Sequence, residues 1–425
     1  MMKLAVSAAV AAVVCSLLGE TYEMRRPSPI MSVPAVARAV LDLELEPPAV
    51  NAEPGSDYRF DHIGFVMNAG MALTRGGRLF AVWHAGEDGP GCFLVGTWSD
   101  DGGRTWTDTR LVVGQRGPIL PIGASGKGVY RSVLIANVWS APDGTLRLYA
   151  YHAMNAFSGR GTLWEIVCRN PDAERPVWDA PRFLAWGASH NKPIVLRDGT
   201  WLLPNDFEDF AVQPAYFPEL DPQRGCGFLA STDAGRTWVR RGWTRPKGTR
   251  HYAENMAVEL ADGRLRQLMR TGLGLMSSES SDGGLTWTTP APPDNLRQVI
   301  SRFGFIRLAS GHLLFVKNGD APDRVDGNRR DKLTVFASDD EGRTWKGGLT
   351  LDGRRNVSYP DVFQAPDGSV FVSYDHDRGT KRDELLFAKF TEADVLAGRL
   401  VTAGSSLTNR IFAVHGLQMT NFSQR

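Results

Sequence analysis

Cysteine, excess charge of one sign and helical patterning are all scarce in this sequence. The chain of 425 residues holds four cysteines, too few for a disulfide framework. Lys and Arg number 48 against 47 Asp and Glu, a formal net charge of +1, so no basic stripe predicts a nucleic-acid partner. No His, Cys and Asp group has the spacing of metal ligands, and no glycine-rich loop has the pattern that binds phosphate. We therefore expect no cofactor, and local arginines must bind any anionic ligand.

A long apolar run is also missing, except at the N-terminus. Lys3 precedes the run Leu4–Leu18, which is typical of a secretory signal and short for a membrane span. We therefore assign residues 1–19 to a signal peptide. Residues 20–56, rich in Pro, Ala and Glu, are assigned to a lead-in segment. The protein is expected to be exported to a periplasm or beyond, with no membrane span.

Turn residues and tryptophan, in contrast, are plentiful. The sequence contains 45 Gly, 25 Pro and 12 Trp, which favours an all-β fold with many tight turns. The pattern Ser-x-Asp-x-Gly-x-Thr-Trp, here called the Asp box, occurs four times: at Ser99–Trp106, Ser231–Trp238, Ser280–Trp287 and Ser338–Trp345. Its Asp can accept from the backbone of its own loop, its Gly allows a positive φ, and its Trp buries a large ring. We interpret the box as a structural staple of a hairpin.

A second repeat consists of an apolar run, a turn at a glycine and another apolar run. The six turn glycines are Gly77, Gly144, Gly199, Gly263, Gly311 and Gly368. Asp-Gly between two apolar runs is a strong hairpin signal, and the spacing of the turns fits four-stranded blades. We predict an all-β, six-bladed β-propeller over residues 57–425, with four Asp-box hairpins and a last blade completed by a terminal segment. Thr391–Asp394 resembles a capping box and predicts one short helix.

The inner strands of a propeller bring residues from distant parts of the sequence to one end of the central channel. Glu254 stands at the start of one such strand, and Arg270 ends the returning strand sixteen residues later. Arg330 lies ten residues before the Asp of the fourth box. Tyr359 lies eight residues before the Asp of the last Asp-Gly turn. These residues are the candidate catalytic and binding groups.

The boxes and these spacings resemble the exo-sialidase superfamily, over roughly residues 60–390. The resemblance implies that Tyr359 is the nucleophile, Glu254 its general base, and Arg270 and Arg330 two of three arginines that bind a substrate carboxylate. The chemistry agrees, because the anomeric carbon of a sialic acid bears a carboxylate that repels an anionic nucleophile. A neutral tyrosine activated by a glutamate avoids that repulsion, and the planar fork of arginine suits a carboxylate.

The sequence departs from the family pattern at the first arginine. That position, ten residues before the first turn glycine, is Met67 here. Asp375 matches the family carboxylate that braces the missing arginine. Arg378, three residues further on, is predicted to fill the vacancy, with Arg59 as the second candidate.

Two loops complete the predicted pocket. The resemblance places the acid/base in the Gly- and Pro-rich loop after Trp83, at Glu87 with Asp88 beside it. An equally good interpretation is that Glu87 and Asp88 are ordinary solvated loop residues with no catalytic role. The segment His190–Lys192 is also placed to line the pocket, although the sequence slightly favours a plain surface loop there.

We expect an exo-glycosidase, a monomer, that releases terminal sialic acid or a related acidic sugar from a glycan or glycoconjugate, with retention. One alternative is a propeller glycosidase or lyase for another acidic sugar, such as a uronic acid, which Met67 favours. Another is a non-catalytic glycan-binding propeller. The set of Glu254, Tyr359 and the two arginines argues against that third possibility.

Overall fold

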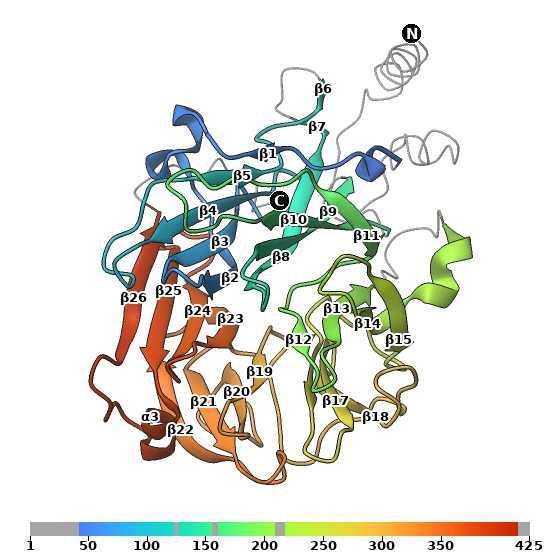
Figure 1. Cartoon of the computed structure of the whole chain (residues 1–425), viewed down its shortest axis with the longest axis vertical. Coiled ribbons are helices and arrows are strands. Elements are labelled where there is room, and N and C mark those ends of the chain that lie inside the picture. The colour runs from blue at the N-terminus through green and yellow to red at the C-terminus, as the bar shows by residue number, and fades with distance from the viewer. Residues whose placement is uncertain (1–41, 123–126, 155–159, 209–216, 415–425) are drawn as a thin grey trace.

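Six antiparallel sheets follow one another around a ring in the computed structural model, which describes residues 42–122, 127–154, 160–208 and 217–414 (Figure 1). The predicted six-bladed β-propeller is confirmed. In each sheet the strands are paired in sequence order, apart from one added outer strand in the first. The predicted signal peptide, residues 1–19, lies outside the described residues.

The first three sheets occupy the N-terminal half of the described chain. The first contains β2 (Met67–Leu73), β3 (Leu79–Ala85), β4 (Phe93–Ser99), β5 (Leu111–Val113) and β1 (Val50–Asn51). The second contains β8 (Arg131–Ser140), β9 (Leu146–Met154), β10 (Thr162–Cys168) and β11 (Arg182–Trp186). The third contains β12 (Ile194–Val195), β13 (Trp201–Phe207), β14 (Gly225–Ser231) and β15 (Val239–Thr244). Strand β1 shows that the lead-in segment adds an outer strand to the first sheet.

The last three sheets close the ring. The fourth contains β16 (Met256–Glu259), β17 (Leu265–Thr271) and β18 (Gly274–Ser280). The fifth contains β19 (Gly304–Arg307), β20 (Leu313–Asn318), β21 (Leu333–Ser338) and β22 (Lys346–Asp352). The sixth contains β23 (Val357–Gln364), β24 (Val370–His376), β25 (Glu384–Phe390) and β26 (Ser406–Ala413). As predicted, a terminal segment, β26, completes the sixth sheet.

A few short elements lie outside the six sheets. They are the ribbon β6 (Leu120–Ile122) and β7 (Lys127–Val129), the helix α3 (Glu392–Ala397), and the 3-10 turns η2 (Asp42–Leu45), η3 (Ser56–Tyr58), η4 (Phe60–His62) and η5 (Pro218–Gln223). The predicted capping box begins α3, because the backbone N–H of Thr391 donates to Asp394 Oδ2 at 2.8 Å. No helix among the described residues is both long and apolar enough to cross a bilayer.

The two repeats explain why the sheets form where they do. All six predicted turn glycines have φ between 86° and 90°, a conformation that favours glycine over residues with a Cβ. Each Asp box binds its own backbone in the same way. In all four, the Ser Oγ donates to the Asp at 2.7–2.8 Å, and the Thr N–H donates to the Asp at 2.9 Å. The box is therefore a self-contained staple.

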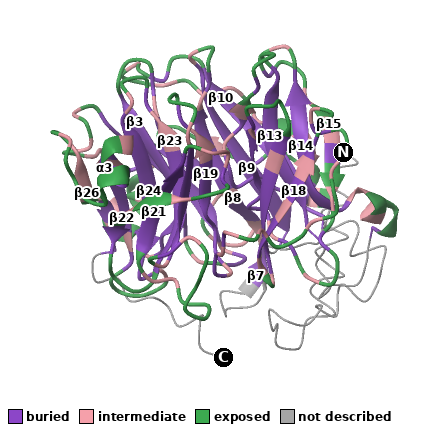
Figure 2. Ribbon diagram, turned by 90° about the horizontal axis from the view of Figure 1, so that it is seen from below, coloured by how far each residue is buried: buried purple, intermediate pink, exposed green. Residues whose placement is uncertain are grey.

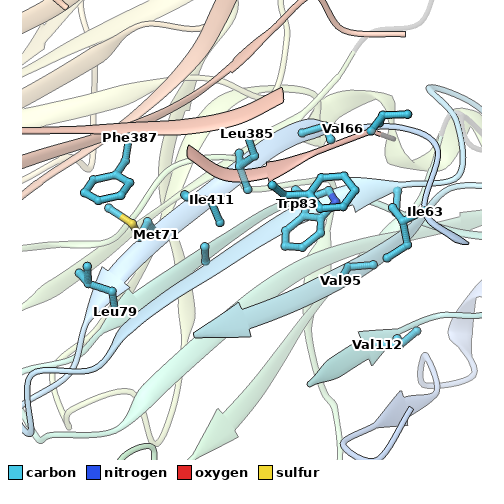
Figure 3. Close-up of a cluster of buried hydrophobic side chains, with 14 of the residues drawn as sticks. Ile63, Val66, Met71, Leu79, Trp83, Val95, Val112, Leu385, Phe387 and Ile411 are labelled. Atoms are coloured by element: carbon cyan, nitrogen blue, oxygen red, sulfur yellow. The ribbon is translucent and has the colours of Figure 1, made fainter. Parts of the chain in front are cut away.

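The ring closes by packing the first sheet against the last. Figure 3 shows Trp83 and Met71 of the first sheet beside Leu385, Phe387 and Ile411 of the sixth. All five side chains are at most 5% exposed, so they bury apolar surface that would otherwise cost free energy in water. Figure 2 shows the strands buried and the exposed residues gathered in the connecting loops and around α3. This closure holds the inner strands at fixed positions around the channel.

Candidate active site

Glu254, Arg270 and Tyr359 meet at one end of the inner strands. Arg270 Nη1 donates to Glu254 Oε1 at 2.6 Å, to Glu254 Oε2 at 2.7 Å and to Tyr359 Oη at 3.1 Å. Glu254 precedes β16 and Arg270 lies on β17 of the same sheet, whereas Tyr359 comes from β23 two sheets further on. All three residues are less than a tenth exposed. One guanidinium nitrogen thus joins the predicted base to the predicted nucleophile.

Tyr359 has a strained backbone. Its φ is 56°, in the left-handed region, which costs a residue with a Cβ about 1–3 kcal/mol. The strain coincides with a register shift between Ser358 and Asp361 in the pairing of β23 with β24. Asn68 holds the distorted backbone, since its Nδ2 donates to the Tyr359 carbonyl at 2.8 Å and to that of Ser373 at 2.9 Å. The bulge thereby turns the phenol toward Arg270.

Two further arginines surround the Tyr359 ring. The Arg378 guanidinium lies 3.9 Å from the ring centroid and that of Arg330 lies 5.5 Å away. Arg378 is fixed by Asp375, with Nη2 to Oδ2 at 3.1 Å. Arg330 donates to the Ile300 carbonyl at 3.2 Å. The two arginines and Arg270 therefore enclose the tyrosine, and we call these four residues with Glu254 the Tyr359 site.

The Tyr359 site keeps hydrogen-bond donors for a ligand. Within the described part of the chain, Nε of Arg270 and Nε of Arg378 are buried without a hydrogen-bond partner. Met67 occupies the place predicted for the missing arginine and packs with Phe65 against Tyr359. Arg59, the second candidate for that role, instead pairs with Asp61 and Asp108, each at 3.6 Å, and is largely exposed. Of the two candidates for the role of the missing arginine, Arg378 is the one that lies beside the Tyr359 ring.

Glu254 is a carboxylate held ionised by its neighbours. Burial favours a raised pKa, but the charge of Arg270 and its hydrogen bonds to the carboxylate outweigh it and hold the pKa of Glu254 well below its usual range. His190 is neutral, because burial first and then the charge of Arg302 lower its pKa to about 4. Its ring lies 5.3 Å from that of Tyr359. The positive charge around the tyrosine therefore comes from arginines.

In the loop with the predicted acid/base, the side chains of Glu87 and Asp88 contact different neighbours. Glu87 accepts from the N–H of Gly91 in its own loop, with Oε1 2.7 Å from the nitrogen. Asp88 is exposed and has Oδ2 4.0 Å from Arg378 Nη1. Asp88, Arg330 and Arg378 also line one open cavity of about 580 Å³. Of the two acids, Asp88 is the one that faces the Tyr359 site.

In the segment His190–Lys192, His190 and Asn191 are buried and Lys192 is partly buried, so the preference for a plain surface loop there was wrong. His190 and Asn191 are each 1% exposed, and the Lys192 ammonium contacts the Asp361 carboxylate. The segment is buried by contacts with other parts of the ring, since Asn191 donates to the Asn255 carbonyl at 3.1 Å and accepts from Arg302 at 2.9 Å. Its polar groups are satisfied by residues distant in the sequence, which no local pattern reveals.

Sequence reasoning also missed Arg302. Its side chain is fully buried, donates to Asn191 Oδ1 at 2.9 Å and pairs with Asp361 Oδ1 at 3.1 Å. It also donates to the Ala69 carbonyl at 3.2 Å, from the first sheet. The only signal was its place just before β19, where a charged residue precedes the apolar run Phe303–Ile306. Arg302 thus ties four parts of the ring together beneath the Tyr359 site.

Two other features lie apart from the Tyr359 site. A cavity of about 620 Å³ opens among the hairpins at the opposite ends of the inner strands and is lined by Thr74, Pro142 and Arg197. Its lining includes no member of the Tyr359 site. Within the described ranges, one group of potential metal ligands is close enough to share an ion: Asp206, Cys226 and His251. None of these residues belongs to the Tyr359 site.

Comparisons with known proteins agree with this architecture. Residues 77–372 match the family model described as a BNR repeat-like domain. An anhydrosialidase from Macrobdella decora is 26% identical over 174 residues, which is 37% of this chain and 22% of that protein.

Two solved structures show the same fold at low identity. A Hadza microbial sialidase superposes with a TM-score of 0.55 at 22% identity, over 74% of this chain and 64% of that one. The intramolecular trans-sialidase from Ruminococcus gnavus, solved with oseltamivir carboxylate, gives a TM-score of 0.54 at 14% identity, over 80% and 97% of the two chains.

Proposed function

Because the chain belongs to the family of BNR repeat-like domains and has the six-bladed propeller of sialidases, we propose that it is a retaining exo-glycosidase for a terminal acidic sugar, sialic acid or a relative. The main observation in support is that three arginines enclose Tyr359 and that one of them also binds Glu254. Three cations around one phenol suit a substrate that carries its negative charge at the reacting carbon.

In the proposed reaction, Tyr359 Oη attacks the anomeric carbon and forms a covalent glycosyl-enzyme, while its proton passes to Glu254. A carboxylate held by Arg270 is a weak base at rest, since Arg270 lies 2.6 Å from its oxygen. A substrate carboxylate that binds Arg270 shares this positive charge and so raises the basicity of Glu254. Substrate binding would thereby activate the base only when the sugar is in place.

The leaving oxygen needs a proton when the glycosidic bond breaks, and Asp88 is the acid that we assign, with Glu87 as the second candidate. Asp88 lines the same cavity as Arg330 and Arg378, whereas Glu87 is engaged with Gly91. In the second step the resulting carboxylate takes a proton from water, which attacks the anomeric carbon, while Glu254 returns its proton to the departing Tyr359 oxygen. Retention of configuration follows from the two displacements.

Release of 4-methylumbelliferone from its sialic acid glycoside tests the proposal. The wild type should turn over the glycoside, and Tyr359→Phe should lose roughly 10³-fold or more in kcat. Tyr149→Phe is the matched control, because Tyr149 is also buried but lies on β9, outside the Tyr359 site. A folded wild-type protein without turnover, or a Tyr359→Phe variant as active as the control, would contradict the proposal.

Met67 supports a second candidate, a glycosidase or lyase for another acidic sugar such as a uronic acid. A methionine packed against Tyr359 leaves one side of the ring apolar, so the carboxylate of the ligand is held from the side of Arg270, Arg330 and Arg378. If the sialic acid glycoside is not cleaved, a uronic acid glycoside is the next substrate to measure. Turnover of the uronate alone, lost in Tyr359→Phe, would establish this second function.

A further inference from the structure

Three potential metal ligands from different parts of the chain meet where β13, β14 and the segment before β16 adjoin. Asp206 and Cys226 are paired residues on neighbouring strands, and His251 forms a bridge with Thr271. Cys226 Sγ lies 3.0 Å from Asp206 Oδ2, and His251 Nδ1 lies 2.9 Å from Asp206 Oδ1. All three side chains are at most 1% exposed.

The donor set fits an ion of the zinc type. A thiolate, an imidazole and a carboxylate are the three ligand classes that zinc binds, at about 2.0–2.3 Å each in a tetrahedron. Donors around such an ion are separated by roughly 3–4 Å, and the three donor atoms here lie within 4.8 Å of one another. The arrangement does not fit a thiol nucleophile, because the sulfur lies against the carboxylate and is closed off from solvent.

A second buried carboxylate, that of Glu208, lies beside the cluster and has one oxygen without a hydrogen bond from the described residues. Glu208 follows Asp206 by two residues, so alternation along an extended chain directs both side chains to the same side. Its Oε1 accepts from the Ala253 N–H at 3.0 Å, whereas Oε2 is buried and accepts no hydrogen bond from the described residues. Arg250, whose side chain is 43% exposed, forms an ion pair with that oxygen at 3.7 Å, a distance beyond hydrogen-bond reach. Two neighbouring buried carboxylates are costly unless a cation lies close to both.

We propose that Asp206, Cys226 and His251 bind one divalent transition-metal ion of the zinc type, with Glu208 placed to supply a further oxygen. Binding would displace the thiol proton of Cys226 to solvent and leave a thiolate on the metal. The ion would fasten β13 and β14 to the segment that carries His251. Glu254 follows His251 by three residues, so the metal would act as a structural support that positions the predicted base.

Metal content of the purified protein tests this proposal without reference to its activity. Because the donors are buried, the ion must be acquired as the chain folds, so the protein is produced in zinc-supplemented medium and analysed by mass spectrometry of its metals. We expect about one zinc ion per chain in the wild type. Cys226→Ser and Asp206→Asn should lose it. Cys168→Ser, which alters another buried free cysteine on β10, should retain it.

Production in cobalt-supplemented medium adds a spectroscopic readout. A cobalt ion bound to Cys226 should give a thiolate-to-cobalt absorption band in the wild type and in Cys168→Ser, and no band in Cys226→Ser. A folded wild-type protein that lacks both zinc and the cobalt band overturns the proposal, whatever the variants do. Zinc retained in full by a folded Cys226→Ser variant overturns it as well.

Discussion

The Asp boxes and the Tyr359 site use similar polar groups in opposite ways. In every box, a Ser, an Asp and a Thr only a few residues apart bind one another and their own backbone. In the Tyr359 site the partners are far apart along the chain, 89 residues between Arg270 and Tyr359 and 291 between Asn68 and Tyr359. The polar network of each box is therefore local, whereas the site exists only once the ring has closed.

The two regions also differ in what they leave unsatisfied. The box carboxylates are fully engaged, and the hydrogen bond from Thr237, followed by others, lowers the pKa of Asp233 to about 2. The Tyr359 site keeps a left-handed tyrosine and two arginines whose Nε atoms have no partner in the described part of the chain. Strain and unused donors at a site that the rest of the fold holds in place are typical of ligand binding. In this propeller the repeat stabilises the fold, and we expect the chemistry where the chain departs from the repeat.

The largest difference between the two regions should appear in kcat when one carboxylate is changed in each. Glu254→Gln should lower kcat for the acidic glycoside by about 10²–10⁴-fold, because an amide cannot accept the phenol proton. Asp340→Asn, in the fourth box, should leave kcat unchanged and lower the melting temperature, because an amide nitrogen in place of Oδ2 cannot accept the hydrogen bond that Thr344 Oγ1 donates. Activity assays and thermal melts of both variants check this. Loss of kcat in a folded Asp340→Asn protein would show that the two regions are not separate.

Acid should destabilise the Tyr359 site through His190. Its pKa is about 4 in the folded protein and 6.5 as a free group, so between these values the unfolded chain binds a proton that the folded chain does not. The free energy of unfolding should therefore fall as the pH drops from about 6.5 to 4, by on the order of 3 kcal/mol for this group.

Urea denaturation at pH 7 and pH 4.5 measures this loss. His190→Gln should lose less stability over this range than the wild type. His312→Gln, a change to a partly exposed histidine paired with Glu392, serves as the control for the substitution itself. An equal loss in wild type and His190→Gln would mean that the histidine does not resist protonation.

Arg378 should bind the substrate through the negative charge of its carboxylate. Arg378→Lys keeps a cation beside Asp375 but loses the bidentate fork, so KM for the acidic glycoside should rise about 10-fold or more. Arg59→Lys, at an exposed arginine, should leave KM unchanged. A glycoside in which an amide replaces the sugar carboxylate sharpens the comparison. If Arg378→Lys weakens binding of the amide as much as that of the acid, Arg378 does not bind the carboxylate.

The fold could be predicted from the sequence because its signals are local and repeated. Six glycine turns and four Asp boxes fix the hairpins, and each signal lies within a few residues of the structure that it specifies. The short helix α3 was predictable for the same reason, through Thr391 and Asp394. The outer strand β1 had no such signal, since its pairing partner β5 lies about sixty residues later. Local patterns therefore predicted the blades but not the added outer strand β1.

The site was only partly accessible from the sequence. Spacing drew attention to Glu254, Arg270 and Tyr359, and the structure brings these three together. Arg302 and the metal-ligand group escaped notice because their partners come from several sheets. The sequence showed no metal-ligand spacing, yet Asp206 and His251 are 45 residues apart and in contact. Contacts of this kind depend on how neighbouring sheets pack in space, which spacing along the chain does not encode.

The smallest effect should appear at the turns, where the repeat itself is altered. Gly311 has a φ of 89° and open space where a Cβ would lie, so Gly311→Ala should cost about 1–2 kcal/mol from backbone strain alone. Gly353 also has open space but no left-handed φ, so Gly353→Ala should be neutral or stabilise by about 0.4–1 kcal/mol through the unfolded chain. Urea denaturation separates the two variants, and kcat should be unchanged in both. Equal stability of Gly311→Ala and Gly353→Ala would show that these turns do not require a positive φ. The interpretation that the repeat acts through local backbone geometry would then be wrong.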